Sequence, residues 1–506
     1  MEAMKRRNYV CSATAGALGL ALISLAACDS GESTPTAPTS GGSAENANAL
    51  VFVNNRGDSS LTSVALKGDS GNVVVNTIPA AEFENAALGD MQFSKEDWIF
   101  VNLAAESKVA TIDPLTAATP EHKANLPTGT RPVHMYRDRN DGEVIWIMND
   151  GDNAPNTTTP GDDLINCNNP ARTGGAVVGG SVTVVHNSHL GPGGSLPTVL
   201  GTTCLLADGH KVAAFADNGR VFVSSETAGE IAVLDGTPGL TGAPTLLGRI
   251  DLCNSNKETG LPAPATCNPE NATGTTPFTP NNAAPHGIRW SKLRQKIYSL
   301  QEGYGEIVEI DPNPPYAITN TWSLANTPYT SYGISPDGKY LLLRGQTTAP
   351  DPQATKLGVI DLSATTPVIA NLTTPELDTA LNGTSPGVFK FSPDSKRFYI
   401  LAGNEATATK KDRLFAFDWT TVAPPALTLL KEIPLLSTGG HSFDVLAQGA
   451  KEAKYLAVSN ASPANSLTII NATDNQEKQT VSVGTNPGGV MVFESGAASA
   501  GNQATN

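Results

Sequence analysis

Residues 332–361 decide the fold, because they contain the stretches YGISPDGKYLLLRG (332–345) and KLGVID (356–361). A short strand-like run leads into a turn and a second apolar run, and the third run ends in aspartate. Proline and small polar residues at 335–338 are the types that a tight turn requires. The runs are rich in β-branched and aromatic residues and have no helical period, so they predict three consecutive strands.

The same unit recurs along the chain. Its two-strand part begins at seven positions, which are Met91, His134, His210, His286, Tyr332, Phe389 and His441. Its third strand recurs as KVATID (108–113), EIAVLD (230–235), EIVEID (306–311), KLGVID (356–361) and RLFAFD (413–418), with SVTVVH (181–186) and SLTIIN (466–471) as diverged copies. Strand units repeated every 45–75 residues or so without helices predict an all-β fold, a β-propeller.

The two ends of the repeat region complement each other. NPGGVMVFESG (486–496) is a first strand with nothing after it, and ALVFVNNRGDSSLTSVAL (49–66) supplies second and third strands with no first strand. We therefore expect both termini to share one blade, which closes the ring and removes an exposed sheet edge. With the seven internal units this makes eight blades, or seven if the register of one unit is in error.

Two of these stretches resemble a known repeat family. SPDGKYLLL (335–343) and VSVGTNPGGVMVF (481–493) resemble the YVTN-type repeats of bacterial surface and periplasmic propellers, which are related in shape to the cytochrome d1 haem propeller. The resemblance covers most of the chain and implies the fold. It does not imply an activity, because propellers host many unrelated functions.

The N-terminal segment predicts export. Lys5, Arg6 and Arg7 precede an apolar stretch at 13–27 that is too short to span a bilayer. Leu25-Ala26-Ala27-Cys28 resembles the bacterial lipobox, which implies cleavage before Cys28 and lipidation of its thiol. Arg6-Arg7 is also compatible with a twin-arginine signal, so the export route stays open.

These features predict a lipid-anchored protein of the cell envelope that faces the periplasm or the exterior, in either the inner or the outer membrane. The expected organisation is a signal peptide at 1–27, a flexible tether at 28–49, the propeller at 50–494 and a disordered tail at 495–506.

Charge excludes two classes of partner. The net charge of the chain is −15, and removal of residues 1–27 takes away three basic and one acidic residue, which leaves −17. Such a protein is not expected to bind nucleic acid or to adhere electrostatically to anionic lipid. We therefore expect membrane attachment through the lipid alone, and a monomer with at most a protein partner in the envelope.

Four cysteines remain after Cys11 leaves with the signal peptide and Cys28 is used by the anchor. In an exported protein they predict two disulfides, with three possible pairings. We expect Cys167–Cys204 and Cys253–Cys267, because each pair closes an insertion rich in Asn, Pro and Gly. The chain contains no C-x-x-C-H motif, so we do not expect a covalently attached c-type haem.

Histidine recurs at one position of the repeat. His134, His210, His286 and His441 each open the first strand of their unit, although the chain has only seven histidines. In the propellers that the sequence resembles, the first residues of the innermost strands lie near one mouth of the central channel. Side chains far apart in sequence should therefore converge there.

The converging residue types point to a metal. Neutral imidazole is a good ligand for zinc and copper, and the thioether of Met91, which aligns with the same position, adds preference for Cu(I). We expect Asp208 and Asp444 nearby, where they could orient the imidazoles or complete the coordination sphere.

Three short motifs also resemble, more faintly, the periplasmic zinc metallochaperone propellers. They are RPVHMY (131–136), PHGI (285–288) and GGHSF (439–443), so the resemblance carries over His134, His286 and His441. The His-rich flexible segment of those proteins is missing here, which puts a chaperone role in doubt. We predict non-enzymatic binding of zinc, or less readily copper, by His134, His210 and His286, with His441 accessory.

Other interpretations stay open. The histidines could be structural groups inherited through duplication. No G-x-S-x-G, H-E-x-x-H or P-loop occurs, yet a lactonase could use Asp208, Glu302 and the same histidines with a divalent ion. A scaffold could bind a protein or polymer through the insertions at 151–180 and 253–285. The acidic stretch 148–163 could bind calcium, and His186 with His189 could form a satellite site or a solvated corner.

Overall fold

A computed structural model describes residues 47–494 apart from several short internal segments. The segments left out are 115–118, 139–142, 152–167, 170–176, 179, 188–193, 206–208, 238–241, 259–266, 268–271, 276–277, 279, 326, 348–353, 373, 404–411, 421–424, 438–441 and 448–451. The expectations for the signal peptide and tether, for Cys28, Cys167, Asp208 and His441, and for the tail at 495–506 therefore fall outside the described residues.

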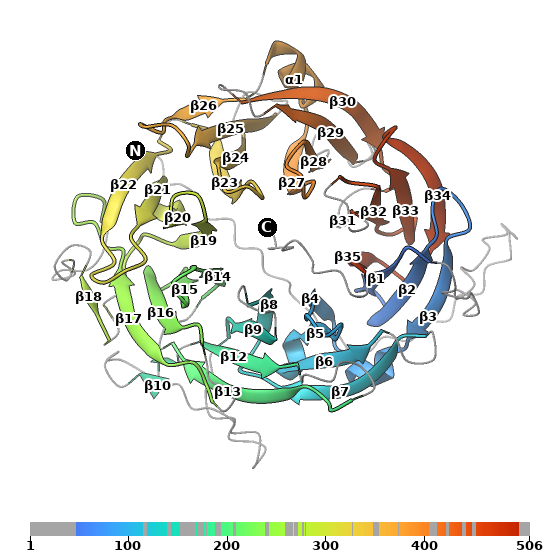
Figure 1. Ribbon diagram of the computed structural model, residues 1–506, viewed down its shortest axis with the longest axis horizontal. Helices are drawn as coiled ribbons and strands as arrows, with labels where there is room; N and C mark the ends of the chain where they lie inside the picture. Colours follow the sequence, from blue (N-terminus) through green and yellow to red (C-terminus); the bar gives the residue numbers. More distant parts are fainter. Residues whose placement is uncertain are drawn as a thin grey trace, which may run out of the picture. The chain divides into compact units, whose positions relative to one another are not determined.

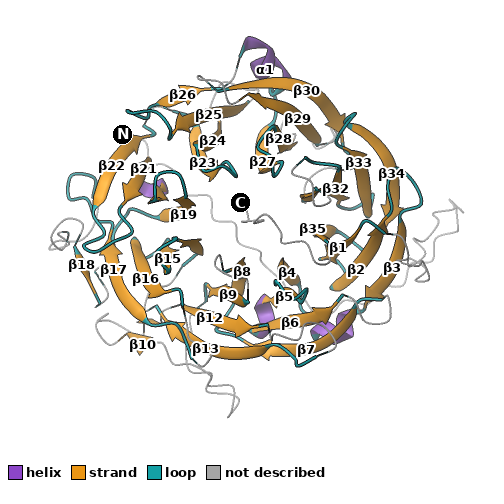
Figure 2. Ribbon diagram, in the orientation of Figure 1, coloured by secondary structure: helices purple, strands orange, loops and turns teal. Residues whose placement is uncertain are grey.

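Strands make up nearly all of the regular secondary structure among the described residues, and eight sheets follow one another around a central axis (Figures 1 and 2). From the axis outward, the first four blades are β35 (Pro487–Phe493), β1 (Ala49–Asn55), β2 (Ser60–Leu66) and β3 (Val73–Ile78); β4 (Leu88–Phe93), β5 (Ile99–Leu103), β6 (Lys108–Asp113) and β7 (Glu121–Pro127); β8 (Pro132–Arg137), β9 (Val144–Asn149), β12 (Ser181–His186) and β13 (Thr198–Cys204); and β14 (Lys211–Phe215), β15 (Arg220–Ser225), β16 (Glu230–Asp235), β17 (Leu246–Asp251) and β18 (Thr273–Gly274).

The next four blades have the same order. They are β19 (Pro285–Ser291), β20 (Lys296–Gln301), β21 (Glu306–Ile310) and β22 (Ile318–Ser323); β23 (Tyr329–Ile334), β24 (Tyr340–Gln346), β25 (Thr355–Asp361) and β26 (Ile369–Asn371); β27 (Ser385–Phe391), β28 (Arg397–Gly403), β29 (Arg413–Thr420) and β30 (Ala426–Pro434); and β31 (Phe443–Leu446), β32 (Tyr455–Asn460), β33 (Ser466–Asn471) and β34 (Gln476–Ser482). The remaining elements are the two-stranded sheet of β10 (Asn168–Asn169) and β11 (Val177–Val178), and the helical segments η1 (Ala80–Phe83), η2 (Ala104–Glu106), η4 (Glu302–Tyr304) and α1 (Pro375–Ala380).

Both ends of the repeat region build the first blade, as predicted. β35 pairs antiparallel with β1, with Val51 opposite Val492 and Phe52 opposite Met491. β35 also contacts the innermost strands of the neighbouring blades, β4 and β31. The shared blade therefore gives β1 a partner on its inner side, so the edge of β1 is not left unpaired. The prediction of eight blades, closed by strands from both termini, is confirmed.

Burial explains why the strands read as continuous apolar runs. Every residue of β1, β2 and β9 is buried, whereas the outermost strand β34 is largely exposed. A second or third strand is covered on both faces by the adjacent blades, so it has no solvent face that would impose alternation. Hydrophobic clusters lie between successive blades and hold them side by side.

One pattern of hydrogen bonds, here called the asparagine lock, recurs inside three blades. An asparagine at the end of the second strand donates through Nδ2 to a serine and a threonine hydroxyl of the third strand. The sets are Asn55 with Ser60 and Thr62 at 2.9 Å each, Asn149 with Ser181 and Thr183 at 3.0 Å each, and Asn460 with Ser466 and Thr468 at 3.4 and 2.9 Å. Buried amides must be hydrogen-bonded, so this pattern fixes the register of second and third strands.

The turn predicted at 335–338 is present. The Ser335 hydroxyl donates to Asp337 Oδ1 at 2.6 Å, and the Gly338 amide donates to the Ser335 carbonyl at 2.8 Å. Gly338 has φ of +73°, a conformation that glycine adopts without strain. The turn therefore joins β23 to β24 for the reasons that its residue types suggested.

The Cys253–Cys267 disulfide is present and closes the insertion after β17. Cys204, at the end of β13, is also disulfide-bonded. Its expected partner, Cys167, is among the residues that are not described. Within the described part of the chain, no helix is both long and apolar enough to cross a membrane.

Candidate functional site

Three of the recurring histidines lie side by side near the axis, on three consecutive blades. His134 belongs to β8, His210 directly precedes β14, and His286 is the second residue of β19. The ring centroids of His134 and His210 are 4.7 Å apart, and those of His210 and His286 are 5.2 Å apart. Residues separated by 152 positions are thus neighbours because equivalent corners of adjacent sheets meet around the axis.

Two of these three inner strands, β8 and β19, have a bulge at the entrance where the histidine lies. In β8, Pro132 is opposite Asn149 but His134 is already opposite Met148, so one residue is extra. In β19, Pro285 is opposite Gln301 and Ile288 is opposite Ser299, so His286 and Gly287 share one partner position. A bulge leaves the extra residue out of the ladder and bends the strand. In β19 it takes His286 out of regular pairing, whereas in β8 the extra residue is Val133 and His134 stays opposite Met148.

The same register explains the position of Met91. In β4, Leu88 is opposite Leu103 and Met91 is opposite Val101, so the bulge contains Gly89 and Asp90. Asp90 therefore stands at the same offset as His134, two residues after the residue that pairs with the end of the second strand, and Met91 lies one residue beyond it. The Met91 side chain packs against the apolar cluster of the first two blades.

A carboxylate faces Nδ1 of each histidine. Asp90 Oδ2 lies 2.6 Å from Nδ1 of His134, and Asp150 Oδ2 lies 2.8 Å from Nδ1 of His210. Asp150 follows β9, and its other oxygen accepts a hydrogen bond from the Lys211 amide at 3.0 Å, which holds the carboxylate in place. For His286 the distance from Nδ1 to a Glu302 oxygen is 3.6 Å.

Asp90 and Asp150 are not the carboxylates that the sequence predicted beside the histidines, which were Asp208 and Asp444. Asp208 falls in a part of the chain that is not described. Asp444 is buried elsewhere and accepts hydrogen bonds from Lys390 Nζ and the Val492 amide, both at 2.8 Å. The available signal for Asp150 was its place at the end of a second strand, one residue after Asn149. Nothing in the sequence pointed to Asp90, because only the bulge in β4 brings it to the offset of His134.

The Nε2 atoms of His134 and His210 face each other at 3.0 Å. Each Nδ1 points at a carboxylate oxygen, so in each ring Nδ1 carries a proton. A neutral imidazole then has a lone pair at Nε2, and two lone pairs at this distance repel. The contact is favourable only when a cation lies between them, either a proton on one ring or a metal ion.

The surroundings of His134 favour added positive charge. Burial by itself would lower the pKa of the imidazole, but the Asp90 carboxylate, through its charge and hydrogen bond, and the charge of Asp150 offset this, so that the pKa is raised. The buried Arg289, also on β19, acts in the opposite direction and does not reverse the result. The site therefore stabilises a cation next to His134.

His286 differs from the other two histidines. Its side chain is 45% exposed, compared with 14% for His134 and 25% for His210. As the side chains stand, no group of three or more His, Cys, Asp or Glu among the described residues is arranged to hold a metal ion. The structure thus contains a preformed pair, His134 and His210, with His286 beside it and free to turn because it is exposed.

The other candidate residues lie elsewhere or are not described. His441 is among the residues left out, as are most of the acidic stretch 152–163 and His189. His186 ends β12 on the third strand of its blade, away from the innermost strands. Asp150 belongs to the acidic stretch 148–163 that could bind calcium, but its carboxylate is hydrogen-bonded to His210 and to the Lys211 amide.

Comparison with known proteins supports the fold. No protein-family model matches the sequence, and no curated protein matches it. Among solved structures, dihydro-haem d1 dehydrogenase NirN in complex with DHE is similar over 90% of this chain and 77% of its own, with 14% identity and a TM-score of 0.55. Apo AztD from Citrobacter koseri is similar over 88% of this chain and 97% of its own, with 15% identity and a TM-score of 0.52.

The fold is shared. The similarity to these two kinds of propeller, expected from the repeat and from the histidine motifs, is confirmed. The periplasmic gluconolactonase PpgL of Pseudomonas aeruginosa is also similar, with 13% identity over 88% of this chain and 99% of its own, but its TM-score of 0.46 is too low to carry an argument. At such identities the similarity speaks for the architecture alone.

Proposed function

We propose that this protein is a lipid-anchored, extracytoplasmic β-propeller that binds a transition-metal ion, zinc in preference to copper. His134 and His210 supply the first two ligands through Nε2, and His286 supplies a third after a change of its exposed side chain. His441 supplies an accessory ligand. The protein is not an enzyme in this proposal, and it uses no c-type haem.

The face-to-face Nε2 pair carries the proposal. Two imidazoles bound to one tetrahedral zinc ion, with bonds of 2.0–2.1 Å, place their nitrogens about 3.3 Å apart. The observed 3.0 Å requires a displacement of only a few tenths of an ångström. The carboxylates on the Nδ1 side correspond to the partners that orient histidine ligands in metalloproteins and fix their tautomer.

Zinc is preferred because the available donors are imidazoles. A Cu(I) site gains from a thioether, but Met91 would have to leave the apolar cluster of the first two blades to act as a ligand. The carboxylates near the rings also favour a divalent cation over a monovalent one.

The same contact disfavours the lactonase alternative. A histidine that acts as a general base must present Nε2 to water or substrate, whereas here each of two Nε2 atoms points at the other. The scaffold alternative rests on the insertions at 151–180 and 253–285. Much of both insertions is not described. The scaffold becomes the second candidate function only if the purified protein holds no metal.

Elemental analysis of the purified protein tests the proposal. We expect near-stoichiometric zinc or copper after equilibration and removal of free metal, and its loss in a His134→Ala, His210→Ala double variant. His122→Ala is the matched control, because His122 lies on the outer strand β7 and pairs with Asn125. Wild-type protein without metal, or a double variant that keeps it, would refute the proposal, and turnover of lactones would favour the hydrolase.

The membrane anchor needs a separate experiment. We expect the wild-type protein to fractionate with membranes and to incorporate labelled fatty acid, and a Cys28→Ala variant to do neither. A variant that stays membrane-bound without label would show that attachment does not depend on the lipid.

A further inference from the structure

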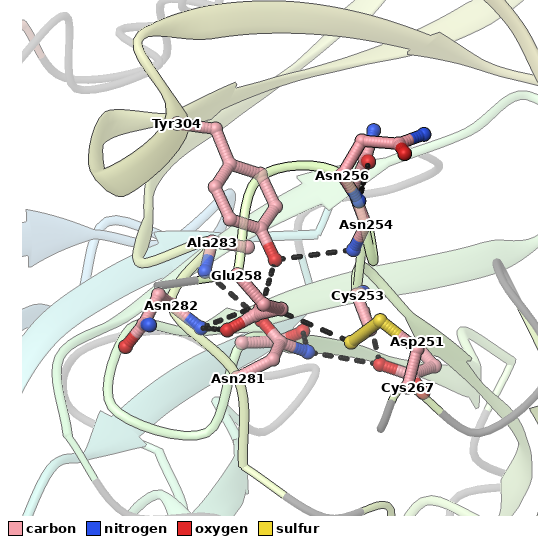
Figure 3. The surroundings of a disulfide bond; sticks show 11 residues. Asp251, Cys253, Asn254, Asn256, Glu258, Cys267, Asn281, Asn282, Ala283 and Tyr304 are labelled. Carbon is pink, nitrogen blue, oxygen red and sulfur yellow. Dashed lines mark hydrogen bonds between the residues drawn. A yellow bond between two sulfur atoms is a disulfide. The ribbon is translucent and has the colours of Figure 1, made fainter. Parts of the chain in front are cut away.

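Glu258, in the loop that the Cys253–Cys267 disulfide closes after β17, contacts the segment that carries His286. Figure 3 shows the Cys253–Cys267 bond with Glu258, Asn282 and Tyr304 around it. Glu258 lies between the two cysteines in sequence, so the disulfide closes the loop on which this carboxylate is mounted. His286 itself lies only four residues after Asn282.

Glu258 and Tyr304 form the contact. The Glu258 carboxylate accepts hydrogen bonds from the Asn282 amide, at 3.1 Å to Oε1 and 3.3 Å to Oε2, and from the Tyr304 hydroxyl (Figure 3). The same hydroxyl accepts a hydrogen bond from the Asn254 amide at 3.1 Å. Burial and the bond to Glu258 raise the pKa of Tyr304, so the hydroxyl stays protonated and keeps its role as donor.

The two points that Glu258 holds are the two sides of the His286 environment. Tyr304 ends η4, the segment that begins at Glu302, and Glu302 is the carboxylate facing His286. The Glu302 amide donates to the Ala284 carbonyl at 3.1 Å, two residues before His286. The Glu258 carboxylate therefore contacts both the segment that leads to His286 and η4, the short helix that carries Glu302. Glu258 itself belongs to a loop closed by a disulfide.

We propose that Glu258, which follows Cys253 in the disulfide-closed segment, and Tyr304 are positioning residues for the third histidine. The inference rests on the proposed metal binding. His134 and His210 are held directly by aspartates, whereas His286 is exposed and only loosely faced by Glu302, so its position depends on the backbone and η4. Because Glu258 contacts both the backbone before His286 and η4, it determines how readily His286 joins His134 and His210.

Tyr304→Phe tests this inference, because it removes the hydroxyl and leaves the ring in place. We expect about tenfold weaker zinc binding in competition with a chromophoric chelator, the range seen when a residue that orients a ligand is lost. Tyr399→Phe is the matched control, because its hydroxyl is buried without a hydrogen-bond partner among the described residues. Glu258→Gln is a second variant, used if Tyr304→Phe does not fold.

A His286→Ala background separates positioning from general damage. If the loop acts through His286, Tyr304→Phe weakens zinc binding in the wild-type background and has no effect when His286 is already absent. Equal losses in both backgrounds, or no loss in either, would overturn the inference. Failure of the proposed function is distinguishable, because then the wild-type protein itself binds no zinc.

Discussion

Replacing Asp90 by asparagine should separate metal affinity from fold. The Asp90 carboxylate keeps the proton of His134 on Nδ1, which leaves Nε2 as a lone pair for a metal. An asparagine can turn its amide N–H towards Nδ1, and His134 then gains by moving its proton to Nε2, where it donates to His210. That tautomer has no lone pair at Nε2 to offer to the metal.

The expected size follows from the exposure of the pair. Loss of a carboxylate behind a histidine ligand costs 10–100-fold in metal affinity, and Asp90 is 31% exposed, so solvent screens part of its charge. We therefore expect the lower end, about tenfold weaker zinc binding or about 1.4 kcal/mol. The metal-free protein should keep its melting temperature within a few degrees, since the histidine pair gains a neutral hydrogen bond.

The pH dependence gives a second measure. Protonated His134 excludes the metal, so in the wild type affinity rises with pH and levels off only above the raised pKa of His134. Without the Asp90 charge the pKa of His134 falls, and affinity should level off at lower pH, although at a weaker value. Chelator competition between about pH 5.5 and 8.5 measures both effects.

Asp361→Asn is the control for this experiment, because Asp361 shapes the turn after β25 through bonds to Ser363. It changes the net charge of the protein equally and leaves the histidines untouched. Unchanged zinc affinity in Asp90→Asn, or a loss that Asp361→Asn reproduces, would refute the role of Asp90.

Three further predictions concern stability. Asn149→Ala removes two buried hydrogen bonds and should cost about 1–3 kcal/mol in urea unfolding; a change within error would show that the asparagine lock does not stabilise the blade. Arg249→Ala removes the ion pair between Arg249 and the buried Glu230 carboxylate and should cost about 3–5 kcal/mol; unaffected melting would contradict this prediction. In the metal-free protein, kept so by a chelator, the folded-state pKa of His134 is raised above its unfolded value. The contribution of His134 to stability is therefore present below about pH 6.5 and is lost as pH rises through the raised pKa. Melting curves without that loss, or with the same loss in Asp90→Asn, would contradict the prediction.

The sequence alone determined the architecture. The repeat of apolar runs without alternation predicted blades covered on both faces, because such strands have no solvent side to show. The incomplete first and last units predicted the shared blade, since a strand without partners would leave an edge. The recurrence of histidine at one corner of the unit was enough to predict that His134, His210 and His286 belong together, because repeats around an axis bring equivalent corners together.

Only the tertiary structure decided the chemistry of that corner. One extra residue in β4 puts Asp90 at the offset of His134 and places Met91 against the apolar cluster of the first two blades, and no linear pattern reports where a bulge falls. Asp150 reaches His210 from the preceding blade, and Glu258 reaches the segment of His286 from a disulfide-closed loop. Hydrogen-bond partners depend on distances of a few ångströms between separate sheets, whereas a repeat specifies only which residues are equivalent.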